Sequence, residues 1–139
     1  MPPVFMNSEG NGPLRRAYCI SRMNKPIDQR LIDLIRLIVG LLVSGDYDAI
    51  ESRSRGVRPN AEQMKEAVQT HGHTLQSLPE TSYAELDVIR VIRATCPTWS
   101  ITVPLWTIEE GRSDLTLECT VIDNGLPELD IEIDNLHVL

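Results

Sequence analysis

Apolar residues recur at helical spacing near the start of the chain. Between Pro26 and Ser44, leucine, isoleucine and valine return every three or four positions, and polar residues mark the opposite side. This spacing predicts an amphipathic helix with a wide apolar face. Pro26 suits the first turn of a helix, and Gly45 suits its end. We therefore expect a helix over residues 26–44 that is buried on more than half of its circumference.

Capping residues predict two further helices. Ser44 or Asp46 can begin a short second helix, because a side-chain oxygen at the cap accepts from free backbone N–H groups of the first turn. Asn60 and Gln63 have the spacing of a capping box, in which each side chain bonds the other residue's backbone N–H. The pattern predicts a third helix that begins at Asn60 and ends near Gly72.

The period changes to two in the second half of the chain, after a polar stretch over residues 73–82 that predicts a loop. Residues 86–94 are rich in β-branched side chains and predict a strand. Clean alternation of apolar and polar positions predicts three more strands, over residues 99–106, 114–121 and 129–134. Pro104 cannot donate a ladder hydrogen bond, so its strand is expected to lie at an edge or to be bulged there.

The order of these elements predicts the fold class. Strong turn sequences, Glu109–Arg112 and Asp123–Gly125, join the last three strands into an antiparallel meander. Helices followed by strands predict an α+β domain, with two or three N-terminal helices packed on a four-stranded, mainly antiparallel C-terminal sheet. Residues 1–24 lack an apolar period and are expected to form a flexible arm. Residues 25–139 are expected to form a single α+β domain.

The net charge of −7 is concentrated at the end of the 139-residue chain. Residues 1–107 carry 11 acidic and 12 basic side chains, whereas residues 108–139 carry nine acidic side chains and one basic one, Arg112. An acidic chain lacks the basic footprint of a nucleic-acid or anionic-membrane binder, so neither partner is expected. The longest apolar run contains Asp33 and Arg36 and predicts no membrane span.

The cysteines and the N-terminal sequence bear on the compartment. Cys19, Cys96 and Cys119 form no C-x-x-C pair and are odd in number. The first residues lack the order of a secretory signal peptide. Both observations favour a reduced, cytoplasmic chain. Cys119 lies in an alternating apolar row and is expected to be a small core residue.

Acidic residues alternate along two neighbouring predicted strands. Because side chains alternate across a strand, Asp130, Glu132 and Asp134 share one face, and Asp114 and Glu118 share the same face of the neighbouring strand. A solvated outer face is one interpretation of this pattern. A docking surface for a basic partner is the other, because complementary charge speeds encounter between proteins.

Two further residues extend this candidate interaction surface. Trp106 is predicted on the outward face beside Pro104, where it would serve as a protein-contact anchor, since tryptophan is enriched among binding hot spots. Arg112 lies at a predicted hairpin tip and is expected either to pair with Asp114 or Glu110 and fix the turn, or to contact a ligand.

Motifs that carry chemistry are sparse. The sequence contains no phosphate-binding loop, dinucleotide fingerprint, nucleophile elbow or zinc signature. His71 and His73 form an H-x-H pair, but a zinc site built on such a pair needs more ligands from elsewhere in the chain. We therefore predict no catalytic residue, no cofactor and no metal site, and we lean toward a role other than enzymatic.

Gly45–Ile50 resembles a turn in a known superfamily. The G-D-Y-D-A-I sequence follows an apolar helix. It is similar to the turn between the first two helices of the nuclear-transport-factor-like superfamily, which includes ketosteroid-isomerase-like and polyketide-cyclase-like proteins. The resemblance implies a cone-like sheet whose concave face lines an apolar pocket. Asp87 and Tyr47 would be the nearest polar candidates for that pocket.

A closer resemblance covers residues 27–139. A family of small bacterial proteins of unknown function combines an apolar helix ending in G-D-Y, a central V-P-L-W-T-x-E-E-G-R-S-D-L-T-L segment, and a closing segment that ends in L-H-V-L. The central and closing segments correspond here to residues 103–117 and 133–139. The resemblance implies no activity.

Two functions are consistent with these features. The first is a non-catalytic protein-interaction or accessory domain that uses the acidic sheet face; an immunity or antitoxin-like role against a basic partner would suit the charge. Its partner would be another protein or a second copy of the chain, as in a homodimer. The alternative is a small-molecule-binding or enzymatic domain with an apolar cone-fold pocket. A filled core favours the first, whereas a closed pocket with a buried carboxylate favours the second.

Overall fold

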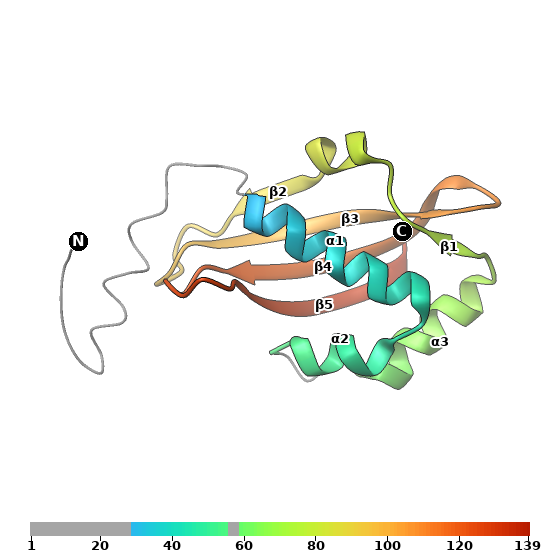
Figure 1. Ribbon diagram of the computed structural model, residues 1–139, viewed down its shortest axis with the longest axis horizontal. Coiled ribbons are helices and arrows are strands. Elements are labelled where there is room, and N and C mark those ends of the chain that lie inside the picture. Colours follow the sequence, from blue (N-terminus) through green and yellow to red (C-terminus); the bar gives the residue numbers. More distant parts are fainter. Residues whose placement is uncertain (1–28, 56–58) are drawn as a thin grey trace.

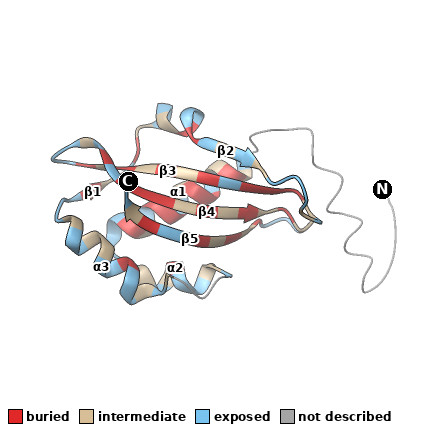
Figure 2. Ribbon diagram, turned by 180° about the vertical axis from the view of Figure 1, so that it is seen from behind, coloured by how far each residue is buried: buried red, intermediate tan, exposed pale blue. Residues whose placement is uncertain are grey.

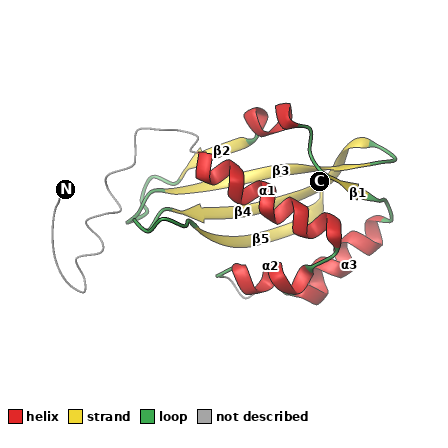
Figure 3. Ribbon diagram, viewed as in Figure 1, coloured by secondary structure: helices red, strands yellow, loops and turns green. Residues whose placement is uncertain are grey.

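The computed structural model describes residues 29–55 and 59–139, so the predicted arm over residues 1–24 lies outside the described residues. Three helices come first in the chain, and a sheet follows (Figures 1 and 3). The helices are α1 (Gln29–Ser44), α2 (Tyr47–Arg53) and α3 (Ala61–His71). The strands are β1 (Leu75–Gln76), β2 (Asp87–Arg90), β3 (Thr98–Thr107), β4 (Gly111–Ile122) and β5 (Asp130–Val138). The predicted α+β class is confirmed.

The predicted helix caps are present. The Asp46 carboxylate accepts a hydrogen bond from the Ala49 backbone N–H, which begins α2. Asn60 and Gln63 form both bonds of the capping box at the start of α3. Gly72 ends α3 with a left-handed φ of 82°, a conformation that costs glycine little because it has no Cβ.

The sheet is antiparallel in all its named pairings, with the order β1-β3-β4-β5. β2 also pairs with β3, at residues 99–102, while β1 pairs with the same strand at residues 106–107. β3 is therefore not an edge strand. The bulge predicted as the alternative is confirmed, because the β3–β4 register shifts between Pro104 and Trp106. Pro104 also falls in the gap between β2 and β1, where it removes no bond to either.

Two elements depart from the sequence-based expectations. The predicted loop over residues 73–82 contains β1 and the start of a 3-10 helix, η2 (Glu80–Glu85). A two-residue strand is too short to show a period, so the pattern could not reveal it. β2 ends at Arg90 rather than at residue 94.

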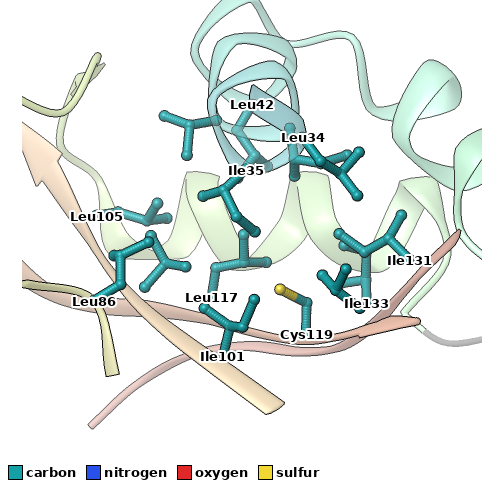
Figure 4. Close-up of a cluster of buried hydrophobic side chains, with 14 of the residues drawn as sticks. Leu34, Ile35, Leu42, Leu86, Ile101, Leu105, Leu117, Cys119, Ile131 and Ile133 are labelled. Atoms are coloured by element: carbon teal, nitrogen blue, oxygen red, sulfur yellow. The ribbon is translucent and has the colours of Figure 1, made fainter. Parts of the chain in front are cut away.

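The core lies between α1 and one face of the sheet. α1 crosses the strands on that face (Figure 1), and its apolar stripe packs on their inward side chains (Figure 4). Cys119 belongs to this core with no exposed area, as predicted. Side chains with at most 2 % exposure include Ile35, Ile38, Leu42, Ile101, Leu117, Ile131 and Ile133.

The segment after α2 bonds to β5, and α1 bonds to the loop before β5. The Arg55 backbone N–H donates to the Ile131 carbonyl at 2.8 Å, and the Ser54 hydroxyl accepts from the Ile133 backbone N–H at 3.0 Å. These bonds occupy backbone groups along the outer edge of β5, which limits pairing with another chain there. Arg30 of α1 bonds the buried Asp123 carboxylate at 2.9 Å.

Among the described residues, Cys119 is a free thiol. No helix among the described residues is long and apolar enough to cross a membrane.

Candidate functional site

Four carboxylates of the predicted acidic face lie on the outer side of β4 and β5. Their neighbours along each strand, among them Cys119, Ile131 and Ile133, are buried under α1 on the opposite side. No helix of the described residues covers the outer side (Figure 2). We call Glu118, Asp130, Glu132 and Asp134 the acidic face.

The sheet register separates these carboxylates from one another. Glu132 lies opposite Thr120, and Asp130 lies opposite Ile122. The Asp134 carboxylate accepts a hydrogen bond from the Thr120 hydroxyl at 2.7 Å. Directly opposed like charges destabilise a sheet, whereas these acids face neutral side chains. The fold therefore holds a concentrated negative charge without placing two carboxylates in one cross-strand pair.

Arg55 and His137 each lie close to a carboxylate of the acidic face. Arg55 lies 3.5 Å from Asp130, at the outer edge of β5. His137 Nε2 lies 3.3 Å from Glu118 Oε2, without hydrogen-bond alignment. Exposed pairs of this kind contribute about 0–1 kcal/mol, so they leave most of the charge available to a partner.

The other three predicted surface residues lie toward the β3–β4 turn. Asp114 is exposed near the start of β4. Trp106 is half-buried and packs against the core, and with Arg112 it lines a hollow of about 180 Å³ beside η2. Arg112 does not pair with Asp114 or Glu110 within the described residues; the Glu110 carboxylate contacts His71 and Thr107 instead. The expectation that Arg112 fixes the turn through an ion pair is therefore wrong.

A second cluster of polar side chains lies where α3 ends against the β3–β4 turn. His71 Nε2 is 3.0 Å from a Glu110 carboxylate oxygen and 2.9 Å from the Ser113 hydroxyl. His73 places its two ring nitrogens 3.8 Å from Glu110 and 3.9 Å from Glu109. We call His71, His73, Glu109 and Glu110 the histidine–glutamate cluster.

Hydrogen bonds keep both glutamates of this cluster in their charged form. Bonds from Ser113, His71 and Thr107 hold the pKa of Glu110 below its ordinary value. Hydrogen bonds from the Thr74 backbone N–H and from the Thr74 hydroxyl likewise hold the pKa of Glu109 below its ordinary value. Both carboxylates are therefore ionised at neutral pH and can act as ligands.

The residues that suggest nucleophilic catalysis do not have the required geometry. Ser113 and Glu110 both contact the same nitrogen of His71, whereas a proton relay needs the base and its orienting carboxylate on opposite ring nitrogens. Burial raises the pKa of the Cys119 thiol to about 12, so the reactive thiolate is not formed at neutral pH.

The apolar pocket implied by the cone-fold resemblance is filled. Inward side chains of the sheet, among them Ile101, Leu117 and Ile133, belong to one buried cluster with Ile35 and Leu42 of α1 (Figure 4). Asp87, proposed as its polar residue, is exposed and lies opposite Thr102, on the same side of the sheet as Glu118. Tyr47 is partly buried at the start of α2. Asp87 therefore lies on the side of the sheet away from α1, and Tyr47 packs against the core while it remains partly exposed.

A family model described as "Domain of unknown function (DUF7668)" matches residues 39–139. The chain belongs to this family. The match begins within α1 and includes all of the sheet, so both the acidic face and the histidine–glutamate cluster lie in the DUF7668 domain. No curated protein and no solved structure matches the chain.

Only the two histidines of the histidine–glutamate cluster could be picked out from the sequence. The H-x-H pair is visible in the sequence of this chain, but Glu110 lies 39 residues after His71. The missing signal is the contact between the end of α3 and the β3–β4 turn, which arises from tertiary packing. The sequence predicts Glu109 and Glu110 as residues of a turn, and nothing local distinguishes a turn glutamate from a ligand.

Proposed function

We propose that this chain is a non-catalytic protein-interaction or accessory domain that binds a basic partner on the acidic face. The observation that carries the proposal is the arrangement of Glu118, Asp130, Glu132 and Asp134 on a side of the sheet that no described helix covers. A charged, accessible sheet face attracts an oppositely charged protein and orients it during encounter. An immunity-like role against a basic protein is one form of this function.

The filled core supports this proposal over the small-molecule alternative. A ligand pocket needs a concave space with a few converging polar groups. The space between α1 and the sheet is instead packed with aliphatic side chains. The negative charge of the acidic face favours a basic protein over nucleic acid as the partner, because phosphates would be repelled.

The decisive experiment compares two variants of equal charge change. The face variant carries Asp130→Asn, Glu132→Gln and Asp134→Asn, which keep side-chain shape. The control variant carries Asp48→Asn, Glu62→Gln and Glu66→Gln, all exposed and on α2 or α3 rather than on the sheet. Affinity purification from the source organism, read by quantitative mass spectrometry, is expected to show a basic protein retained by wild type and control but lost by the face variant. An identical partner list for all three proteins would reject the proposal.

Self-association is a separate form of protein interaction, which would not use the acidic face. Two acidic faces repel each other, so a homodimer would use another surface, such as the exposed Ile89 and Ile92 near the β2 edge. Sedimentation equilibrium of wild type and an Ile89→Ser/Ile92→Ser variant tests this form. A wild-type monomer at all accessible concentrations would reject it.

The proposed compartment is the cytoplasm. Disulfides are rare in the cytosol, so the thiols of a cytoplasmic protein stay reduced. Rapid alkylation of intact cells followed by mass spectrometry of Cys96 tests this compartment. A freely alkylated Cys96 is expected for a cytoplasmic protein, and a protected one would contradict that location.

A further inference from the structure

The histidine–glutamate cluster brings together ligand types that the proposed interaction function does not use. One ring nitrogen each of His71 and His73 and a carboxylate oxygen of Glu110 all lie within 4.8 Å of one another. The two histidines come from the end of α3, and Glu110 comes from the turn between β3 and β4. The cluster thus joins two parts of the chain that are far apart in sequence.

Backbone features position each of these side chains. Gly72 adopts a left-handed conformation between the two histidines, and their rings meet edge to face with centroids 5.0 Å apart. The Thr107 hydroxyl, which is fully buried, bonds both the Glu110 carboxylate and the Glu110 backbone N–H at 3.0 Å. The ligand atoms are therefore held near one point by the helix end and by the turn.

We propose that His71, His73 and Glu110 form a binding site for a divalent transition-metal ion of the zinc type. Two imidazoles and one carboxylate are a common zinc ligand set, with a fourth position left for water. Ligand atoms about 2.0–2.1 Å from a tetrahedral ion are about 3.3 Å apart. His71 Nε2 lies 3.0 Å from one Glu110 carboxylate oxygen, and His73 Nε2 lies 3.8 Å from the other. One ligand atom from each of the three residues lies within 4.8 Å of the other two, so small side-chain shifts would bring all three onto one ion.

The surroundings of His73 have the arrangement that supports a metal ligand. A metal-binding imidazole usually directs its second nitrogen toward a carboxylate or carbonyl, which fixes the ring. His73 directs Nε2 toward Glu110 and Nδ1 toward Glu109. Glu109 is itself anchored by the Thr74 backbone N–H at 2.8 Å and by the Thr74 hydroxyl at 2.9 Å. Glu109 would therefore act as the positioning residue behind His73.

The ligand chemistry distinguishes zinc-type ions from hard cations. Calcium binds six to eight oxygen atoms, and magnesium keeps several waters and oxygen ligands. Two imidazole nitrogens satisfy neither preference, whereas they suit zinc, copper and nickel. A histidine–carboxylate contact without metal is the competing interpretation, and it predicts no response to any of these ions.

Isothermal titration of metal-free, untagged protein with ZnCl₂ tests the site. We expect one equivalent to bind, with at least a tenfold loss of affinity in His73→Ala and in Glu110→Gln. Glu109→Gln should weaken binding by about 10–100-fold, as loss of such supporting groups does. Calcium and magnesium chloride should give no comparable heat.

His137→Ala is the matched control, because His137 is similarly exposed and also faces a carboxylate, Glu118. The chain has three histidines, so imidazole NMR signals of His71 and His73, but not of His137, should move on zinc addition. Circular dichroism confirms that each variant is folded. Absence of zinc binding by wild type, or binding unchanged in folded His73→Ala and Glu110→Gln, would overturn the proposal.

Discussion

Truncation of Ile35 tests whether the space between α1 and the sheet is a packed core. Ile35 has no exposed area, whereas Leu37 on the same helix is 49 % exposed. Ile35→Ala removes three carbon atoms, which at about 0.8 kcal/mol each corresponds to about 2.4 kcal/mol of lost burial. The cavity left behind adds to this, so we expect a loss of about 2–5 kcal/mol in the free energy of unfolding. Leu37→Ala should cost about 0.5 kcal/mol or less.

Urea unfolding provides the measurement. Circular dichroism follows the helices, and fluorescence follows the tryptophans, of which Trp99 is 4 % exposed in the core. Coincident transitions with both probes would justify a two-state free energy. A loss below about 1 kcal/mol in Ile35→Ala would refute the packed core, because an open pocket tolerates such a truncation. That result would restore the small-molecule alternative.

Three other predictions follow from single residues. Asn60→Ala removes the capping box of α3 and should lower the free energy of unfolding by about 1 kcal/mol in the same urea assay. Gly111→Ala places a Cβ on a residue with φ of 75° and should cost about 1–2 kcal/mol by thermal or urea unfolding. The Cys119 pKa is raised to about 12, above its ordinary value of 9.0, so the folded state keeps a proton that the unfolded state loses as pH rises. Stability should therefore fall from about pH 9 toward pH 12, by about 1 kcal/mol between pH 8 and 10, and Cys119→Ala should remove this component.

The fold was predictable where local signals agreed with tertiary packing. The wide apolar stripe of residues 29–44 and the capping pair Asn60 and Gln63 each specify a helix without reference to distant residues. The strands after residue 98 were predictable because one side of the sheet is buried under α1 and the other is not. β1 was not predictable, since two residues become a strand only through pairing with the end of β3.

The acidic face was predictable from the same alternation, except where a bulge interrupts the pairing of β4 and β5. The register between β4 and β5 shifts between Glu118 and Cys119, so Asp134 is an extra residue between the Glu118–Asn135 and Cys119–Ile133 pairs. Simple alternation from Asp130 would place Leu136 outside, but it is 5 % exposed and belongs to the core. The sequence could predict which acids share a face, but it could not predict where the pairing slips.

The acidic side chains of residues 108–139 fall into groups with different surroundings. Asp123 is buried and bonded to Arg30, and Glu109 and Glu110 face the two histidines at the end of α3. The remaining strand acids lie on the outer side of the sheet. The negative charge of residues 108–139 is therefore not one surface, and neutralising the acidic face leaves the histidine–glutamate cluster intact. A face variant that loses its partner but still binds zinc would separate the two proposals, because each depends on carboxylates that the other does not use.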